Sequence, residues 1–217
     1  MIPDHIDQIS ADVFDKKDSL AVATFVDWVR KKLAPRIPTD ARIVSIDGWD
    51  GVGKSAIGDS LAECLAVPLV DLDEYLDRDQ GEFLAHLRLP ELETTISTGL
   101  DEARRVIVTG CMMDLALEGI GRPADFRVYV MRLSGTLSNP NLLWVDRVDE
   151  LYSDKTADEL IAEDDGVTRK WAELEGKPIP EGQSAVPDLQ QELIRYHKSW
   201  RPHDRAHLIV KVIERRS

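Results

Sequence analysis

Short apolar runs alternate with longer segments of helical periodicity through most of the chain. In one such segment Ile57, Leu61 and Leu65 recur every four positions, which places them on one face of a helix. The short runs are rich in β-branched residues, as strands are. The pattern predicts strands at 41–47, 67–73, 104–110, 125–133 and 206–214. It predicts helices at 10–33, 54–66, 90–99, 112–119 and 187–199.

The order of these elements predicts the architecture. Strands that alternate with helices form βαβ units, whose strands run parallel in a sheet with helices on both faces. The continuous apolar runs "RIVSI" and "VIV" are typical of strands buried on both faces. We therefore predict an α/β fold of three layers, with a five-stranded parallel sheet between helices.

Two parts of the chain fall outside this alternation. Pro35 and Pro38 end the first helix, since proline cannot continue it. Residues 1–40 are therefore predicted to form an N-terminal helical extension, and residues 41–217 a single domain. Within that domain, residues 134–188 are acidic and end in a Gly- and Pro-rich piece, which predicts a partly helical insertion and a loop.

Composition and charge narrow the choice of compartment and partner. The chain has 217 residues, of which 43% are hydrophobic, and a net charge of −13, which argues against nucleic acids and anionic membranes as partners. No apolar run approaches the roughly 20 residues of a membrane span. Cys64 and Cys111 are expected to be free thiols in a reducing cytoplasm. An exposed apolar stripe on the 10–33 helix would indicate a homodimer.

The stretch "GWDGVGKS", Gly48 to Ser55, matches the pattern G-x-x-x-x-G-K-[ST] in full. An apolar strand precedes it and a helical pattern follows it, which is the context that a phosphate-binding loop requires. The glycines let successive amides point at one anion, and the helix dipole adds positive potential there. Lys54 would reach the β- and γ-phosphates, while the Ser55 hydroxyl would ligate Mg²⁺.

This motif predicts the P-loop NTPase fold, with ATP and Mg²⁺ as cofactors. The predicted nucleotide-binding residues are Gly48, Asp50, Gly51, Val52, Gly53, Lys54, Ser55 and Ala56.

Other features separate the classes of P-loop protein. A GTPase needs a D-x-x-G and an N/T-K-x-D motif after the P-loop, and the sequence has neither. Motor ATPases place an acid after the third strand, where this chain has Thr109. A small-molecule kinase therefore remains as the preferred class.

Such a kinase needs a carboxylate that orients the acceptor hydroxyl and accepts its proton. Asp71 and Asp73, in "VDLDEYLDR", end the second strand. Carboxyl ends of neighbouring parallel strands meet at the crevice that the P-loop faces. Asp73 lies nearer the strand tip and is the preferred candidate. An acidic strand-to-helix turn without a chemical role is the alternative.

Together these stretches resemble one branch of the P-loop kinases. "DGWDGVGKS", "LDEYLD", "VIVTG", "FRVYVMRL" and "YHKSWRPHDRAHLIV" are similar to elements of the uridine kinase and phosphoribulokinase branch, over about positions 41–214. The resemblance implies a five-stranded parallel core, ATP, Mg²⁺ and a nucleoside, sugar or similar small molecule as acceptor. It also implies that Asp73 is the base or Mg²⁺-organising acid and Tyr75 the neighbouring aromatic residue.

The sequence departs from that branch after the third strand. The branch has Glu-Gly there, and this chain has Thr109-Gly110, so one metal-organising carboxylate is missing. Asp71 or Asp114 is a hypothetical substitute. By the same resemblance, His86 and Arg88 would line the acceptor pocket together with Asp71 and Tyr75.

Kinases of this class close a lid that brings an arginine to the transferring phosphoryl group. The insertion at 134–188 is the predicted lid. We select Arg195 and Arg201 as the catalytic arginines. The arginines also weighed for this role are Arg132, Arg147, Arg169 and Arg205.

The sequence therefore predicts ATP- and Mg²⁺-dependent phosphoryl transfer to a hydroxyl of a small molecule, with Lys54, Asp73, Arg195 and Arg201 as catalytic residues and with Ser55 and Asp73 at the metal. Two alternatives stay open. One is a P-loop NTPase that acts as a switch or regulatory module. The other is a degenerate nucleotide-binding protein, which the missing acid at Thr109 would explain.

Overall fold

The computed structural model describes residues 6–13, 19–77, 83–136, 139–144 and 148–216. The strands are β1 (Asp7–Val13), β2 (Ile43–Gly48), β3 (Leu69–Asp71), β4 (Val106–Thr109), β5 (Phe126–Thr136), β6 (Asn139–Trp144) and β7 (Leu208–Arg216). The α-helices are α1 (Ser19–Trp28), α2 (Lys54–Leu65), α3 (Leu89–Ala103), α4 (Met113–Gly119), α5 (Val148–Leu151), α6 (Ala157–Leu174) and α7 (Asp188–Trp200). A π-helix (Val29–Leu33) continues α1, and short 3-10 helices cover Ala34–Arg36, Leu72–Tyr75 and Leu84–His86.

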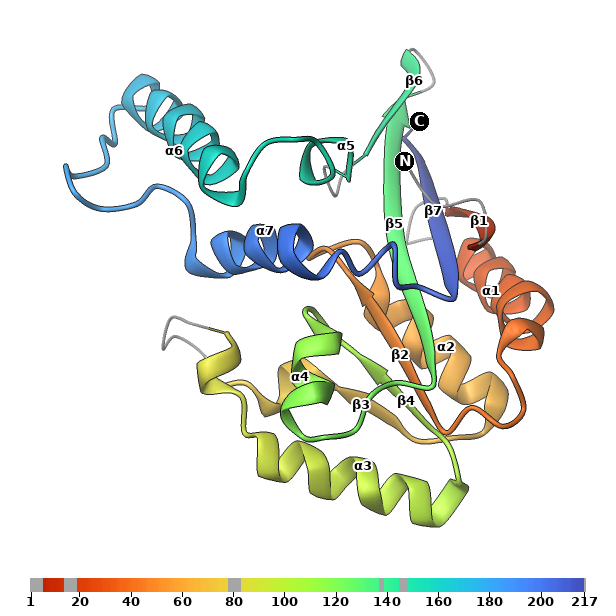
Figure 1. Ribbon diagram of the computed structural model, residues 1–217. Coiled ribbons are helices and arrows are strands. Elements are labelled where there is room, and N and C mark those ends of the chain that lie inside the picture. Colours follow the sequence, from red (N-terminus) through yellow and green to blue (C-terminus); the bar gives the residue numbers. More distant parts are fainter. Residues whose placement is uncertain (1–5, 14–18, 78–82, 137–138, 145–147, 217) are drawn as a thin grey trace.

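The strands form one sheet in the order β1-β7-β5-β2-β4-β3 (Figure 1). All neighbours along this path are parallel, and β6 adds an antiparallel pairing to β5. The predicted α/β class, with a parallel sheet covered by helices, is confirmed. The five predicted strands are all present, and β1 and β6 extend the sheet to seven strands.

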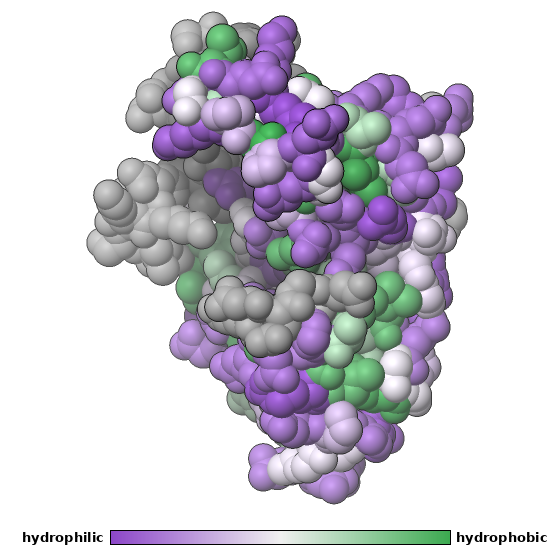
Figure 2. All heavy atoms as spheres, turned by 90° about the vertical axis from the view of Figure 1, so that its left-hand side faces the viewer, coloured by the Kyte–Doolittle hydropathy of each residue, from purple (hydrophilic) through white to green (hydrophobic). Residues whose placement is uncertain are grey.

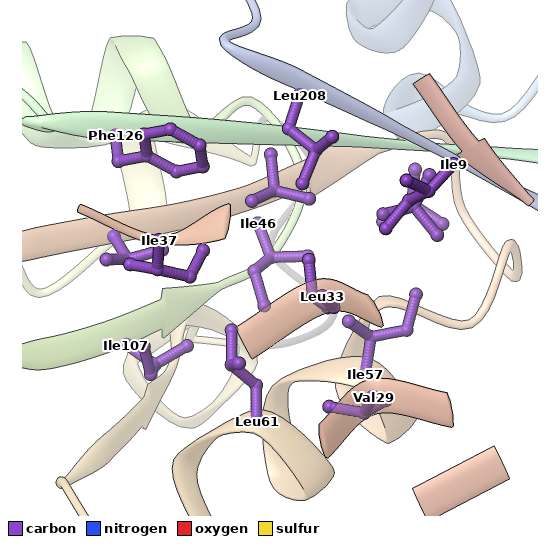
Figure 3. Close-up of a cluster of buried hydrophobic side chains, with 14 of the residues drawn as sticks. Ile9, Val29, Leu33, Ile37, Ile46, Ile57, Leu61, Ile107, Phe126 and Leu208 are labelled. Atoms are coloured by element: carbon purple, nitrogen blue, oxygen red, sulfur yellow. The ribbon is translucent and has the colours of Figure 1, made fainter. Parts of the chain in front are cut away.

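Successive residues of the central strands feed two separate cores, because side chains alternate across a strand. Val44 and Ile46 of β2 pack against the side covered by the π-helix and α2, as Figure 3 shows for Val29, Leu33, Ile57 and Leu61. Ile43 and the β4 residues Val106 and Val108 face the other side, which α3, α4 and α7 cover. Helices thus cover both faces, as the continuous apolar strands predict.

The helix predicted over residues 10–33 is wrong in its first part. Residues 7–13 form β1, which pairs with β7 from Asp7↔Leu208 to Val13↔Glu214. Ile9 and Ala11 are buried while Gln8 and Ser10 are exposed, a period of two that marks a half-buried strand. Residues 14–18, also inside that prediction, lie outside the described part of the chain.

The predicted insertion also begins differently. β5 runs on to Thr136 and pairs with β6, so strand replaces the expected start of a partly helical segment at 134. The later part agrees with the prediction: α6 opens on a capping box between Thr156 and Glu159, and residues 175–187 contain no helix or strand. Arg147 lies outside the described residues.

α6 lies away from the sheet and contacts α5 and α7 (Figure 1). The face of the molecule that includes it is largely hydrophilic, with scattered apolar side chains (Figure 2). On α6 itself Val167, Trp171 and Leu174 are exposed. Within the described residues, no helix is both long and apolar enough to cross a membrane.

Candidate active site

The predicted phosphate-binding loop joins β2 to α2 at the carboxyl edge of the sheet. Gly51 and Gly53 have φ values of 72° and 103°, a left-handed backbone that glycine adopts without strain. At Gly48 a Cβ atom would lie 2.5 Å from the carbonyl oxygen of Val130, so β5 passes too close for any side chain. The glycine pattern of the motif therefore has a steric reason at each of these three positions.

Lys54 is the first residue of α2 and is only 7% exposed. Its Nζ donates to the carbonyl oxygen of Trp49 at 2.7 Å, so the ammonium lies along the inner side of the loop. Ser55 and Ala56 are exposed, as are Asp50 and Gly51, whereas Val52 is buried. The first turn of α2 is thus accessible to a ligand, and the ammonium lies beside it.

Asp71 and Asp73 lie two strands away along the same edge. Asp71 ends β3, and its Oδ1 accepts the backbone N–H of Asp73 at 3.1 Å, which starts the 3-10 helix Leu72–Tyr75. Asp71 is half-buried and Asp73 exposed. In the sheet, Asp71 of β3 is paired with Thr109 of β4, and Thr109 is paired with Ile46 of β2. The two carboxylates and the P-loop therefore flank the tip of β4.

Thr109 points toward α2, since a Cβ on Gly58 would lie 3.4 Å from the Thr109 Cβ. It is fully buried, and its Oγ1 has no hydrogen-bond partner in the described part of the chain. Cys111 lies beside Lys54, and burial raises the pKa of its thiol to about 11, so the thiol is neutral at physiological pH.

Asp114 is held away from a metal-organising role. Its Oδ1 accepts from Arg127 Nε at 2.9 Å, and its Oδ2 lies 3.5 Å from Arg205. The side chain is 5% exposed. Of the two hypothetical substitutes for the missing carboxylate, Asp71 therefore has the more suitable position.

The residues predicted to line the acceptor pocket lie on two segments that pair with each other. Leu76 and Leu87 form an antiparallel bridge, and the Arg88 N–H donates to the Tyr75 carbonyl at 2.9 Å. His86 is on the same segment, one residue before Leu87. Tyr75 and Arg88 both line a groove of about 550 Å³. Of the four residues predicted for acceptor binding, Tyr75 and Arg88 therefore share a groove, while Asp71 and His86 do not line it.

Arg88 is also fixed by its neighbours. Its guanidinium bonds Asp77 at 2.6 Å, Glu91 at 3.0 Å and the Glu74 carbonyl at 2.7 Å. These acids raise the pKa of Arg88 above its usual value, so the group is always charged. The side chain keeps 34% exposure, which leaves part of it accessible from the groove.

The structure places a different arginine at the cradle from those selected on sequence. Arg132, on β5, donates from Nη1 to the Gly51 carbonyl at 2.7 Å. Arg195 instead lies 3.6 Å from Asp158, and Arg201 pairs with Asp204 at 2.5 Å. The catalytic role of Arg195 and Arg201 stays a prediction, and it requires that the insertion at 134–188 changes its position. Arg132 is distinguished by its place on β5, two residues beyond Val130, which pairs with Gly48 at the start of the loop.

A buried polar network lies behind the loop. Asp47 Oδ1 accepts the Gly48 N–H at 2.7 Å, and Oδ2 accepts the Tyr196 hydroxyl at 2.5 Å. Burial raises the pKa of Asp47 to about 6, while both hydrogen bonds and the charge of Lys54 act in the opposite direction. Next to Tyr196, His197 donates from Nδ1 to the Leu193 carbonyl and accepts the Tyr129 hydroxyl at Nε2. The sequence predicts no role in the loop for Tyr196 or His197, because Asp47 and Tyr129, which they bond, are remote from them in the chain.

His197 predicts a pH dependence of stability. Burial lowers the pKa of its imidazole from 6.5 to about 4. The unfolded chain therefore binds a proton near pH 6.5 that the folded protein does not bind until near pH 4. Neutral His197 therefore stabilises the folded protein fully above pH 6.5. As the pH falls from 6.5 to about 4, the free energy of unfolding is expected to decrease by about 3 kcal/mol from this group.

The measurement is the free energy of unfolding in urea, above and within that pH window, for the wild type and His197→Gln. We expect the difference between the two proteins to shrink on acidification. Asp47→Asn serves as the control of opposite sign, because the raised pKa of Asp47 favours the folded state as the pH falls. An unchanged difference between wild type and His197→Gln would contradict the assignment.

Comparison with known proteins places the similarity in the same region of the chain. Residues 50–89 match the sequence profile of the shikimate kinase family. A shikimate kinase of Thermus thermophilus is 44% identical over 45 residues, which cover 21% of this chain and 24% of the relative. One of Novosphingobium aromaticivorans is 39% identical over 83 residues, 37% of each protein. The chain thus spans well under half the length of these curated relatives.

Two solved structures are similar at lower identity. A possible uridine kinase from Bacillus stearothermophilus aligns with a TM-score of 0.34 and 14% identity over 50% of this chain and 80% of that one. A shikimate kinase from Bacteroides thetaiotaomicron aligns with a TM-score of 0.31 and 18% identity over 77% and 84%.

The segment matched by the family profile begins inside the phosphate-binding loop and extends through Asp71, Asp73 and Arg88. Of these residues, the loop and the two aspartates lie at one edge of the sheet. The resemblance of this chain to P-loop small-molecule kinases is thereby confirmed.

Proposed function

We propose that this protein transfers the γ-phosphoryl group of ATP to a hydroxyl of a small molecule, with Mg²⁺ bound. The observation that supports this most is the placement of a complete phosphate-binding loop and the carboxylates of Asp71 and Asp73 on either side of the β4 tip. A hydroxyl acceptor between them would lie next to both the phosphate cradle and a proton acceptor.

Each group of this edge has a role in the proposal. The amides of residues 51–55 and the ammonium of Lys54 hold the phosphates, and their positive charge stabilises the transition state. Asp73 orients the acceptor hydroxyl and accepts its proton. Arg195 and Arg201, on or next to α7, are proposed to reach the phosphoryl group when the insertion at 134–188 closes as a lid, which excludes water.

The residues present also suit a magnesium ion. Mg²⁺ prefers oxygen ligands and retains several waters, and the exposed hydroxyl of Ser55 and the carboxylate of Asp73 supply oxygens of this kind. When bound, the ion neutralises charge on the β- and γ-phosphates. Asp71, whose Oδ1 accepts a hydrogen bond from the Asp73 N–H, would position the carboxylate of Asp73.

For the acceptor we propose a polar molecule bound in the groove that Tyr75 and Arg88 line, with Asp71 and His86 as further contacts from the same two segments. The partial match to shikimate kinases makes shikimate one candidate, beside the nucleosides and sugars that the sequence resemblance implies. We also propose that the protein works in the cytoplasm, without nucleic acid or membrane partners.

The test is ATP consumption by the purified protein with Mg²⁺, across a panel of shikimate, nucleosides, sugars and other alcohols. The proposal expects that one class of acceptor stimulates ADP formation and yields a phosphorylated product. Slow hydrolysis with a preference for GTP, independent of any acceptor, would instead indicate a switch. Tight ATP binding without turnover on any acceptor would indicate a degenerate nucleotide-binding protein.

A further inference from the structure

The start of the phosphate-binding loop is held by α7, a helix that lies far from it in sequence. Tyr196 is 2% exposed and donates its hydroxyl to Asp47, which is 6% exposed. The other oxygen of Asp47 accepts the Gly48 N–H. A continuous hydrogen-bonded chain therefore runs from α7 to the first glycine of the loop.

A second contact joins the next residues of both segments. The ring of His197 lies 5.3 Å from the ring of Trp49, centroid to centroid. Trp49 also packs against the cluster of Leu151, Leu160 and Ile194, which belongs to α5, α6 and α7. Its carbonyl oxygen is the acceptor for Lys54 Nζ. Tyr196 and His197 of α7 thus contact Asp47 and Trp49, at the start of the loop. The carbonyl of Trp49 in turn holds the ammonium of Lys54.

Gly48 lies close against the backbone of β5. It has no space for a Cβ against the Val130 carbonyl, and its left-handed φ of 154° sets the direction in which the loop leaves β2. The Asp47 carboxylate is the partner of the Gly48 N–H, and a buried N–H needs such a partner. The orientation of the Asp47 carboxylate therefore affects the direction of the loop.

We propose that Tyr196 is a positioning residue for the phosphate-binding loop, which acts through Asp47 and couples α7 to nucleotide binding. The inference rests on the proposed function, because it requires that the loop binds a nucleotide. It extends the nucleotide site beyond the P-loop motif to the helix on which the insertion packs. The other charged or titratable groups that act on Asp47 include Lys54 of α2, Asp114 of α4, Cys111 and Tyr152, and none of the variants below alters them.

The test compares Tyr196→Phe with Ser199→Ala by calorimetric titration with Mg²⁺ and ADP. Both changes remove one side-chain hydroxyl of α7, but that of Ser199 donates to the Arg195 carbonyl on the same helix. We expect Tyr196→Phe to weaken ADP binding about tenfold and Ser199→Ala to change it less than about twofold. Thermal unfolding of both variants shows whether they lose similar stability.

A double-mutant cycle with Asp47→Ala distinguishes positioning from general damage. If Tyr196 acts through Asp47, the double variant binds ADP no more weakly than Asp47→Ala alone, because the two residues form one interaction. Additive losses, or ADP affinity at the wild-type level in Tyr196→Phe, would overturn the inference. Should Tyr196→Phe not fold, Asp47→Ala alone carries the test, and ADP affinity at the wild-type level in that variant would overturn it as well. Failure of the wild type to bind ADP would refute the proposed function itself, which is a different result.

Discussion

Replacement of Lys54 by alanine is expected to lower the rate of ATP-dependent phosphoryl transfer about a thousandfold. The ammonium is buried at the first turn of α2, with its Nζ 2.7 Å from the Trp49 carbonyl. In such a site a positive charge acts on phosphate oxygens with little screening by water. The measurement is the initial rate of ADP formation with the best acceptor of the panel, together with the dissociation constant of ATP.

The matched control is Lys198→Ala. Lys198 also donates its Nζ to a backbone carbonyl, that of Ser153, at 2.7 Å, but it lies on α7 outside the cradle. Its removal is expected to change the rate less than about threefold, because its Nζ bonds Ser153 and not the phosphate-binding loop, so that the lost contact, about 1 kcal/mol, affects the stability of the fold. Equal losses in the two variants, or a tenth of the wild-type rate left in Lys54→Ala, would argue against the role of Lys54.

Asp73→Asn is expected to reduce kcat by about 10²–10³ while ATP affinity stays within a few fold. An amide matches the carboxylate in shape but cannot accept the proton of the acceptor hydroxyl. The turn at this position is expected to survive, because Asp71 accepts a hydrogen bond from the backbone N–H of residue 73, which the substitution leaves in place. The measurement is single-turnover phosphoryl transfer at saturating ATP, with binding followed separately.

Glu63→Gln is the control for Asp73→Asn, because it removes an exposed carboxylate from the last turn of α2, at the end of that helix remote from the phosphate-binding loop. It is expected to leave kcat nearly unchanged. A loss of ATP affinity as large as the loss of kcat in Asp73→Asn would assign Asp73 to metal binding alone. Wild-type kcat in Asp73→Asn would remove it from the mechanism.

Local sequence was sufficient for the features whose partners are close in the chain. The loop from Gly48 to Ser55 needs glycines, a lysine and a helix start within eight consecutive positions, so the motif and its flanks predict both its conformation and its place between β2 and α2. Asp71 and Asp73 follow from the same reasoning, since the end of a parallel strand is a local property and its edge is shared with the P-loop.

The sequence did not predict β1 and β6, which are strands because they pair with other strands of the sheet. β1 pairs with a strand about two hundred positions later, at Asp7↔Leu208. The alternation of buried Ile9 and Ala11 with exposed Gln8 and Ser10 is too short to outweigh the helical pattern that follows. β6 exists because β5 continues to Thr136 and offers it a partner. Strand pairing of this kind depends on the order of strands in the sheet, which periodicity does not encode.

The sequence by itself determined the class of fold, the phosphate-binding loop and the acids at the neighbouring strand tip, because each depends on residues that are adjacent along the chain. The tertiary structure decided which side chains from elsewhere complete the site. Arg132 reaches Gly51 across 81 positions and Tyr196 reaches Asp47 across 149. Those contacts arise only when β5 lies beside β2 and α7 lies over the carboxyl edge of the sheet, and long-range packing sets both positions.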